Sequence, residues 1–309
     1  VGVNLIYASF YYAQNPDQFI ESLMDNLDRT RLEVDMITFY GPQFKQVDNR
    51  VQSLKLVEHN LTQAVLFGSD GEVLQPSESF YKKAILVERG SFRPITHVNV
   101  DMMQSASAQF IQEKSVLGED IMVLSELTLR NLKGTEAHMD HVDTDDFLAR
   151  IDTINSLGYP VLISNYFEYF RLSSYFRRYT DRTIGIVMGI NNLVEIFKDK
   201  YYDGLEGGIL EAFGRLFKNK IKLYVYPMKG SSFDEYRRLM ESESSGQVFE
   251  KHALGGSNNV IITANNVQVE LHLRSLYAYL LENHFIEPIT QFNQACMEIF
   301  SRDVFHKIK

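Results

Sequence analysis

The chain has 309 residues, of which 45% are hydrophobic and 23% charged, close to the averages of globular proteins. Its formal net charge of −9 argues against non-specific binding to nucleic acid, because phosphate binding calls for a basic surface. The single cysteine, Cys296, excludes an internal disulfide and favours a reducing, cytoplasmic compartment. No apolar run approaches the roughly 18 residues of a membrane-spanning helix, so no membrane partner is expected.

Short β-rich runs alternate along the chain with segments whose apolar residues recur every three to four positions. The runs predicted as strands are 3–10, 33–40, 64–67, 96–102, 121–129, 160–166, 183–189 and 222–228. Helical stripes are predicted between them, at 19–27, 47–57, 147–157 and 205–217. The turn-like GSDG at 68–71 indicates a hairpin, and AILVERG at 84–90 fits either a helix or a strand.

This alternation predicts an α/β fold of repeated strand–helix units with a mainly parallel sheet and C-terminal helices. The pattern fits both a doubly wound open sheet and a (β/α)8 barrel. We expect an α/β core over 1–229, a polar insertion or mobile loop over 230–259, and a helical segment over 260–309 that packs on the core. The chain begins at Val1 inside an apolar run, which predicts a further domain upstream.

Ligands of both architectures bind at the carboxyl ends of the strands. Polar residues at the predicted strand ends are Asp101, Glu126, Asn165 and Asn191. The carboxylates of Asp101 and Glu126 are candidates for a general acid or base, and the two asparagines for ligand binding. The alternative is that such residues cap helices and satisfy loop backbone.

Two segments concentrate basic residues in this acidic chain. The first, 82–94, contains Arg89 and Arg93, and the second, 165–182, combines Arg171 with many aromatic residues. Arginine forms bidentate hydrogen bonds to phosphate or carboxylate, so these three arginines are candidates for binding an anionic ligand. The alternatives are a solvated charged face for 82–94 and, for 165–182, either a core-packed helix or a partner surface.

The run HMDHVDTDD at 138–146 offers His138, His141 and Asp143 as weak metal candidates. Their spacing matches no specific metal motif, and aspartates at this place favour a helix start, so no metal is predicted. The dinucleotide fingerprint, the P-loop and the nucleophile elbow are all absent from the sequence. The sequence therefore names no cofactor.

Several stretches of the chain resemble an uncharacterised bacterial protein family. They include GVNLIYASFYY, LVERGSFRPITHVNVDM, VLISNYFEYFRLSSYFRRYT, GIVMGINNLVEIFKDKYYDGLEGG and LRSLYAYLLENHFIEPI. The resemblance implies a bacterial origin and a longer N-terminal part. Proteins of that family carry the labels nicotinate-nucleotide adenylyltransferase and TonB-dependent receptor. The first label needs an H-x-G-H motif that this sequence lacks, and the second needs a membrane barrel, which the strand–helix pattern contradicts. The resemblance therefore transfers no catalytic residue.

Two functions remain as hypotheses. The first is a cytoplasmic domain that binds a small anionic or nucleotide-like metabolite at the strand ends, with its enzymatic character left open. The second is a non-catalytic assembly protein that uses the aromatic helix 166–179 and the 230–259 insertion as contact surfaces, including contacts between copies of the chain.

Overall fold

The computed structural model of the protein describes residues 1–28, 31–133, 141–218, 220–243, 260–299 and 304. It divides into two compact units, each made of two stretches of chain. The first unit comprises Val1–Ile95 and Met122–Asp181, and the second comprises Thr96–Ile121 and Arg182–Lys309. The chain therefore passes from one unit to the other three times.

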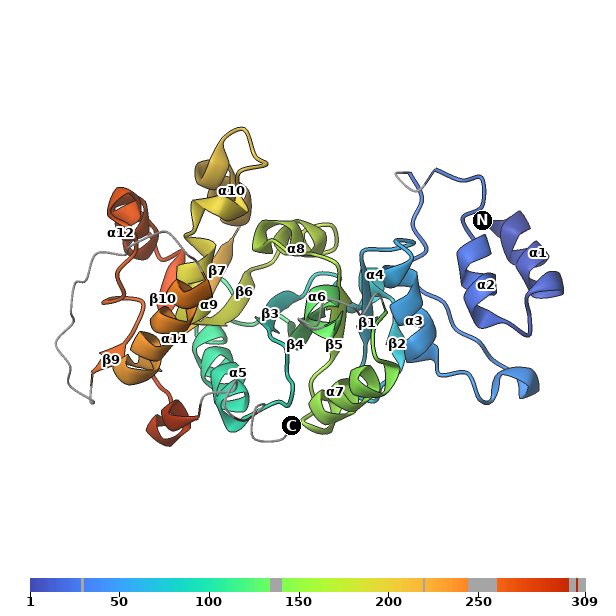
Figure 1. Ribbon diagram of the computed structural model, residues 1–309, viewed down its shortest axis with the longest axis horizontal. Coiled ribbons are helices and arrows are strands. Elements are labelled where there is room, and N and C mark those ends of the chain that lie inside the picture. The colour runs from blue at the N-terminus through green and yellow to red at the C-terminus, as the bar shows by residue number, and fades with distance from the viewer. Residues whose placement is uncertain (29–30, 134–140, 219, 244–259, 300–303, 305–309) are drawn as a thin grey trace. The chain divides into compact units, whose positions relative to one another are not determined.

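The first unit is built on five strands in the order β3–β4–β5–β1–β2. Strands β4 and β5 are parallel, whereas β1 is antiparallel to both β5 and β2. The strands are β1 (Ala64–Phe67), β2 (Val73–Leu74), β3 (Ala84–Arg89), β4 (Ile121–Thr128) and β5 (Val161–Ser164). The helices are α1 (Gly2–Tyr11), α2 (Pro16–Ser22), α3 (Asn49–Glu58), α4 (Pro76–Ser79), α6 (Leu129–Lys133), α7 (Thr144–Ser156) and α8 (Tyr169–Phe176), as Figure 1 shows.

The GSDG segment forms the predicted hairpin between β1 and β2. Phe67 pairs with Val73, and the amide of Gly68 donates to the carbonyl of Glu72. Gly71 has a φ of +82°, a left-handed conformation that a glycine adopts at no steric cost. The hairpin prediction is therefore confirmed.

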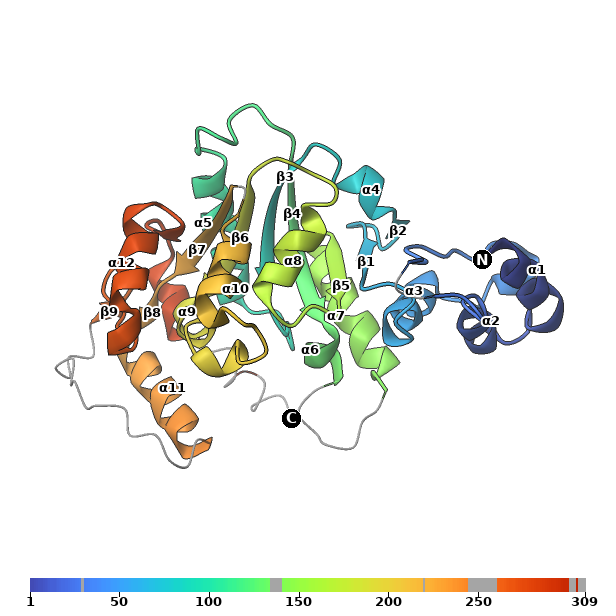
Figure 2. The same ribbon diagram turned by 90° about the horizontal axis from the view of Figure 1, so that it is seen from above.

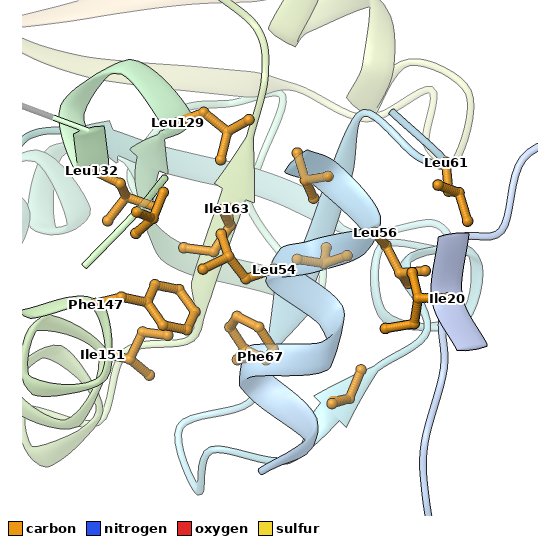
Figure 3. Packing of buried hydrophobic residues seen from close by; sticks show 14 of the residues in the cluster. Ile20, Leu54, Leu56, Leu61, Phe67, Leu129, Leu132, Phe147, Ile151 and Ile163 are labelled. Carbon is orange, nitrogen blue, oxygen red and sulfur yellow. The ribbon is translucent and has the colours of Figure 1, made fainter. Parts of the chain in front are cut away.

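One hydrophobic core of the first unit lies where helices α3 and α7 cover the strands (Figure 3). Helical spacing brings the apolar side chains of each helix to its inner face, and alternation along β1 and β5 brings every second strand residue to meet them. The members shown include Leu54 and Leu56 of α3, Phe147 and Ile151 of α7, and Phe67 and Ile163 of the strands. The predicted helical stripes at 47–57 and 147–157 are thus confirmed.

The second unit contains three strands in the order β10–β7–β6, which are all parallel. Figure 2 shows β6 and β7 side by side, as their six-residue register requires. The strands are β6 (Ile184–Gly189), β7 (Ile221–Tyr226) and β10 (Ile286–Pro288), with a separate ribbon of β8 (Met228–Lys229) and β9 (Ile261–Ile262). The α-helices are α5 (His97–Phe110), α9 (Ile190–Ile196), α10 (Gly208–Leu216), α11 (Gly230–Glu243) and α12 (Arg274–Glu282).

Three of the predicted strands are wrong. Residues 3–10 lie in helix α1, and residues 96–102 enter helix α5. Helix α5 begins with a capping box in which Thr96 and Asn99 satisfy each other's backbone donors, and its buried residues Met102, Met103 and Ala106 follow helical spacing. Segment 33–40 forms no ladder, because its amides bond elsewhere: that of Val34 to the carbonyl of Leu61, and that of Phe39 to the Asn49 side chain.

The polar segment 230–259 also differs from the prediction of a loop-like excursion. Its first part forms helix α11, Gly230–Glu243, and residues 244–259 lie outside the described residues. The expected domain boundaries at 229 and 259 stay predictions, whereas the predicted C-terminal helix is present as α12.

The α/β class with a mainly parallel sheet and C-terminal helices is confirmed. Among the described residues, β2 of the first unit and β10 of the second each pair with one neighbour, as edge strands do. Within the described part of the chain, no helix combines the length and apolar character needed to cross a membrane.

Replacing Phe147 by alanine tests the core of the first unit. Phe147 is fully buried and packs edge-on against Phe67, so Phe147→Ala is expected to lower the free energy of unfolding by about 3–5 kcal/mol. Denaturant unfolding followed by circular dichroism measures the change. Phe10→Ala is the control, because Phe10 is 82% exposed, and it should shift stability by at most about 0.5 kcal/mol. Equal losses in the two variants would contradict this core.

Candidate functional site

An ion pair between Arg89 and Glu126 lies buried at the carboxyl ends of three strands of the first unit. Arg89 is the last residue of β3, Glu126 lies on β4, and Ser164 is the last residue of β5. The Arg89 guanidinium donates to both carboxylate oxygens of Glu126, at 2.7 and 2.9 Å, and the Ser164 hydroxyl donates to the same carboxylate at 2.6 Å. The network therefore joins the ends of β3, β4 and β5.

With its remaining contacts, every nitrogen of the Arg89 guanidinium donates a hydrogen bond. Its third nitrogen donates to the carbonyl of Phe167 at 2.7 Å, and its carbon lies 4.4 Å from the centre of the Tyr169 ring. Burial opposes the charge, but the Glu126 carboxylate outweighs it and raises the pKa of Arg89. A buried charge is costly unless it is paired and hydrogen-bonded, and both charges meet that condition here. Arg89 and Glu126 thus serve to organise the strand ends.

A second arginine, Arg150 of α7, joins the loop that follows β3 to helix α6, which directly follows β4. One nitrogen of its guanidinium donates to the carbonyls of Ser91 and Asn131, at 3.0 and 2.9 Å. The Asn131 side chain in turn donates to the carbonyl of Gly90 at 3.1 Å. Backbone carbonyls of the loop and of the helix are therefore held from within the protein.

Arg93, in the loop after β3, and Arg130, on helix α6, extend toward solvent. Arg93 forms an ion pair with Asp146 of α7 at 3.1 Å, and 38% of its side chain is exposed. Arg130 is exposed, and its guanidinium lies 4.9 Å from the centre of the partly exposed ring of Phe167. Among the described residues, no carboxylate lies within ion-pair distance of Arg130. The guanidinium of Arg130 is thus accessible to an anionic ligand.

Asn165 and Arg171 lie near the same strand end but contact neither of these clusters. Asn165 is exposed and donates to the Asn60 side chain at 3.3 Å. Arg171 lies on α8, is 59% exposed and pairs with Glu168 at 3.0 Å. The aromatic helix is largely core-packed, because its Phe170, Tyr175 and Phe176 are buried.

The weak metal candidates do not come together. His141 is exposed, and the Asp143 carboxylate accepts the amides of Asp145 and Asp146 as the N-cap of α7. His138 lies outside the described residues. Across the residues that can be described, no three His, Cys, Asp or Glu side chains are arranged to hold a metal ion.

Asp101 lies in the second unit, on helix α5 and not at the end of a strand as predicted. Its carboxylate nevertheless meets the carboxyl end of a strand, because it accepts the hydroxyl of Tyr226, the last residue of β7, at 2.5 Å. The same oxygen accepts the amide of Asn293 at 2.9 Å. Burial, and then the Asp101 carboxylate, raise the pKa of the Cys296 thiol. Asp101 thus links Tyr226 to the backbone of Asn293, and its charge acts on the nearby Cys296 thiol.

Asn191 lies in the first turn of the short helix α9. Its side-chain oxygen folds back onto Gly189, where an added Cβ would lie 2.9 Å from it. In the described part of the chain no hydrogen bond joins Asn191 to Asp101, so the structure does not bring these two residues together.

Sequence reasoning missed Arg130, Asn131 and Arg150, and it considered Asp146 only within the run 138–146, as a weak metal candidate or a helix cap. For Arg150 a signal existed, because it lies on the apolar stripe of α7, three residues after Phe147 and four before Ile154. An arginine on the buried face of an amphipathic helix needs polar partners. No comparable pattern marks Arg130.

No protein-family model matches this sequence, and no curated protein is significantly similar to it. The resemblance to an uncharacterised bacterial family therefore stays a prediction.

Replacing Glu126 by glutamine tests the buried ion pair. Glu126→Gln keeps the shape but leaves the Arg89 charge uncompensated in the interior, so unfolding should become easier by about 3–5 kcal/mol. The control is Glu168→Gln, which removes the partner of the exposed Arg171 and should cost less than about 1 kcal/mol. Denaturant titration of the three proteins measures both changes, and a small loss for Glu126→Gln would show that the pair is dispensable.

Replacing Asp101 by asparagine tests the cluster of the second unit. Because the carboxylate raises the pKa of the Cys296 thiol, Asp101→Asn should lower it and increase the thiolate fraction at a given pH. The rate of iodoacetamide labelling is measured against pH, with Cys296 as the chain's single thiol. The midpoint should move to lower pH, whereas exposed Asp203→Asn should leave it in place. An unchanged midpoint in Asp101→Asn would show that the Asp101 carboxylate does not affect the Cys296 thiol.

Proposed function

We propose that the first unit binds a small anionic metabolite with a planar ring at the carboxyl ends of β3, β4 and β5. The observation that carries the proposal is the Arg130–Phe167 pair, an exposed guanidinium over an aromatic ring with no acidic partner among the described residues. An arginine in this position offers donors to an anion, and the ring offers a stacking surface. Nucleotide-like molecules combine both features.

The buried networks support the proposal by fixing the backbone on which the candidate residues lie. Arg89 with Glu126 fixes the strand ends, and Arg150 fixes the carbonyls of Ser91, in the loop after β3, and of Asn131, in helix α6. Binding then costs little free energy for ordering the protein, and preorganised sites bind more tightly for this reason. Because Glu126 is fully buried and both its oxygens are occupied, we assign it to support of the site and propose no acid–base step for it.

An assembly role is the second candidate function. The surface that favours it is helix α1, and not the aromatic helix 166–179 expected from the sequence. The aromatic helix faces the core, whereas α1 exposes Val3, Ile6 and Phe10 along one stripe. Their spacing of three and four residues gathers them on one face of the helix. Exposed apolar patches commonly mark interaction sites.

Thermal melting with adenosine 5′-monophosphate, ribose 5-phosphate and inorganic phosphate tests the binding proposal. A ligand at about 100 times its dissociation constant adds about 2.7 kcal/mol of stability, a readily measured shift. Arg130→Gln should weaken binding at least about tenfold, a loss of about 1.4 kcal/mol, because the variant removes the positive charge that binds the anion. Arg274→Gln, an exposed arginine of the second unit, should change affinity less than about twofold.

The ring makes a separate contribution that a third variant isolates. Phe167→Ala should weaken binding of the nucleotide but leave ribose 5-phosphate and phosphate unchanged, because only the nucleotide carries a ring that stacks. A flat response to all three compounds, or equal weakening by Arg130→Gln and Arg274→Gln, would overturn the proposal.

A further inference from the structure

Asp146 of α7 is shared by two arginines. One of its carboxylate oxygens lies 3.1 Å from Nε of Arg93, and the other pairs with a terminal nitrogen of Arg150. The exposed fractions of the side chains are 38% for Arg93, 22% for Asp146 and 3% for Arg150, so the triad runs from the surface into the interior.

Two guanidinium groups converge on the single carboxylate of Asp146. Within the described chain, Nε of Arg150 is buried without any hydrogen-bond acceptor. Burial lowers the pKa of the Arg150 guanidinium, and the nearby Arg93 charge lowers it further, whereas Asp146 and then Asp143 oppose these effects. An unused donor on a buried charge is costly in the ligand-free protein.

The position of Arg150 is fixed independently of Asp146. The carbonyls of Ser91 and Asn131, which follow β3 and β4, accept from its other terminal nitrogen. The guanidinium therefore stays in place when the carboxylate leaves. The neighbouring Asp143 is engaged with the amides of α7, where it caps the helix.

We propose that the Arg93–Asp146–Arg150 triad is a subsite for a phosphate group, in which Asp146 occupies the place of the ligand's dianion until the ligand displaces it. The inference rests on the proposed binding function and names where the charged end of the ligand lies. A phosphate dianion carries more charge than a carboxylate, and its oxygens offer more acceptors to the two arginines. Asn131, whose carbonyl accepts from Arg150, directly follows Arg130 in helix α6, so the subsite and the Arg130–Phe167 pair meet at this short helix.

Asp146→Asn is the decisive variant, because removing a competing carboxylate should strengthen phosphate binding. If Asp146 occupies the subsite in about nine molecules of ten, its removal raises the apparent affinity about tenfold. Isothermal titration with inorganic phosphate, and then with adenosine 5′-monophosphate, measures the gain at constant ionic strength. Asp145→Asn is the matched control: it removes the same charge from the same helical turn but belongs to no ion pair among the described residues, and it should change affinity less than about twofold.

Arg93→Gln keeps the test decisive if Asp146→Asn folds poorly. Arg93 is partly exposed, so the variant should fold, and it should bind phosphate about tenfold more weakly. Wild-type binding with no gain in Asp146→Asn and no loss in Arg93→Gln would overturn the subsite while leaving the proposed function intact. No binding of phosphate or nucleotide by any of the proteins would overturn both.

Discussion

The first unit depends on burying two opposite charges at the ends of three strands. Arg89 and Glu126 lose almost all contact with water, and such a pair is tolerated only when geometry and hydrogen bonds satisfy it completely. The Ser164 hydroxyl and the Phe167 carbonyl complete that requirement. The strand ends therefore cannot shift in register without exposing an unpaired charge. The segments that follow the strands therefore begin from fixed points, and they carry Arg130 and Phe167, the pair on which the proposed binding function rests.

The two arginine networks lie on opposite faces of the strands. Leu127 belongs to the core beneath α3 and α7, so the side chain of Glu126 points to the other face. Arg150 approaches from α7 and binds the carbonyls of Ser91 and Asn131 on the first face. Helix α6, which follows β4, is thus held at Asn131. Arg130 lies on this helix, so its exposed side chain projects from a fixed backbone.

The strand predictions succeeded where a strand is buried on both faces, because a short run of consecutive apolar residues then marks it. The runs in β5, β6 and β7 are apolar at nearly every position, which only a covered strand tolerates. They failed at residues 3–10 and 96–102, where β-branched residues indicate a strand but packing and the Thr96–Asn99 capping box decide for a helix. The candidate site was predictable in part: a predicted strand end pointed to Glu126, and a basic stretch pointed to Arg89. No spacing in the sequence links them to Arg150, which bonds to backbone carbonyls about 20 to 60 residues away.

The three passages of the chain between the units impose an order on its synthesis. Strand β1 ends at Phe67, but its partner β5 begins only at Val161. At about 5–20 residues per second, a ribosome needs about 5–20 s to make the intervening chain. During that time the apolar segment of β1 lacks the neighbour that later covers its edge, and helix α5, made in the interval, belongs to a unit whose strands do not yet exist. Nascent chains of this protein should therefore depend on chaperones until residue 181 has left the ribosome.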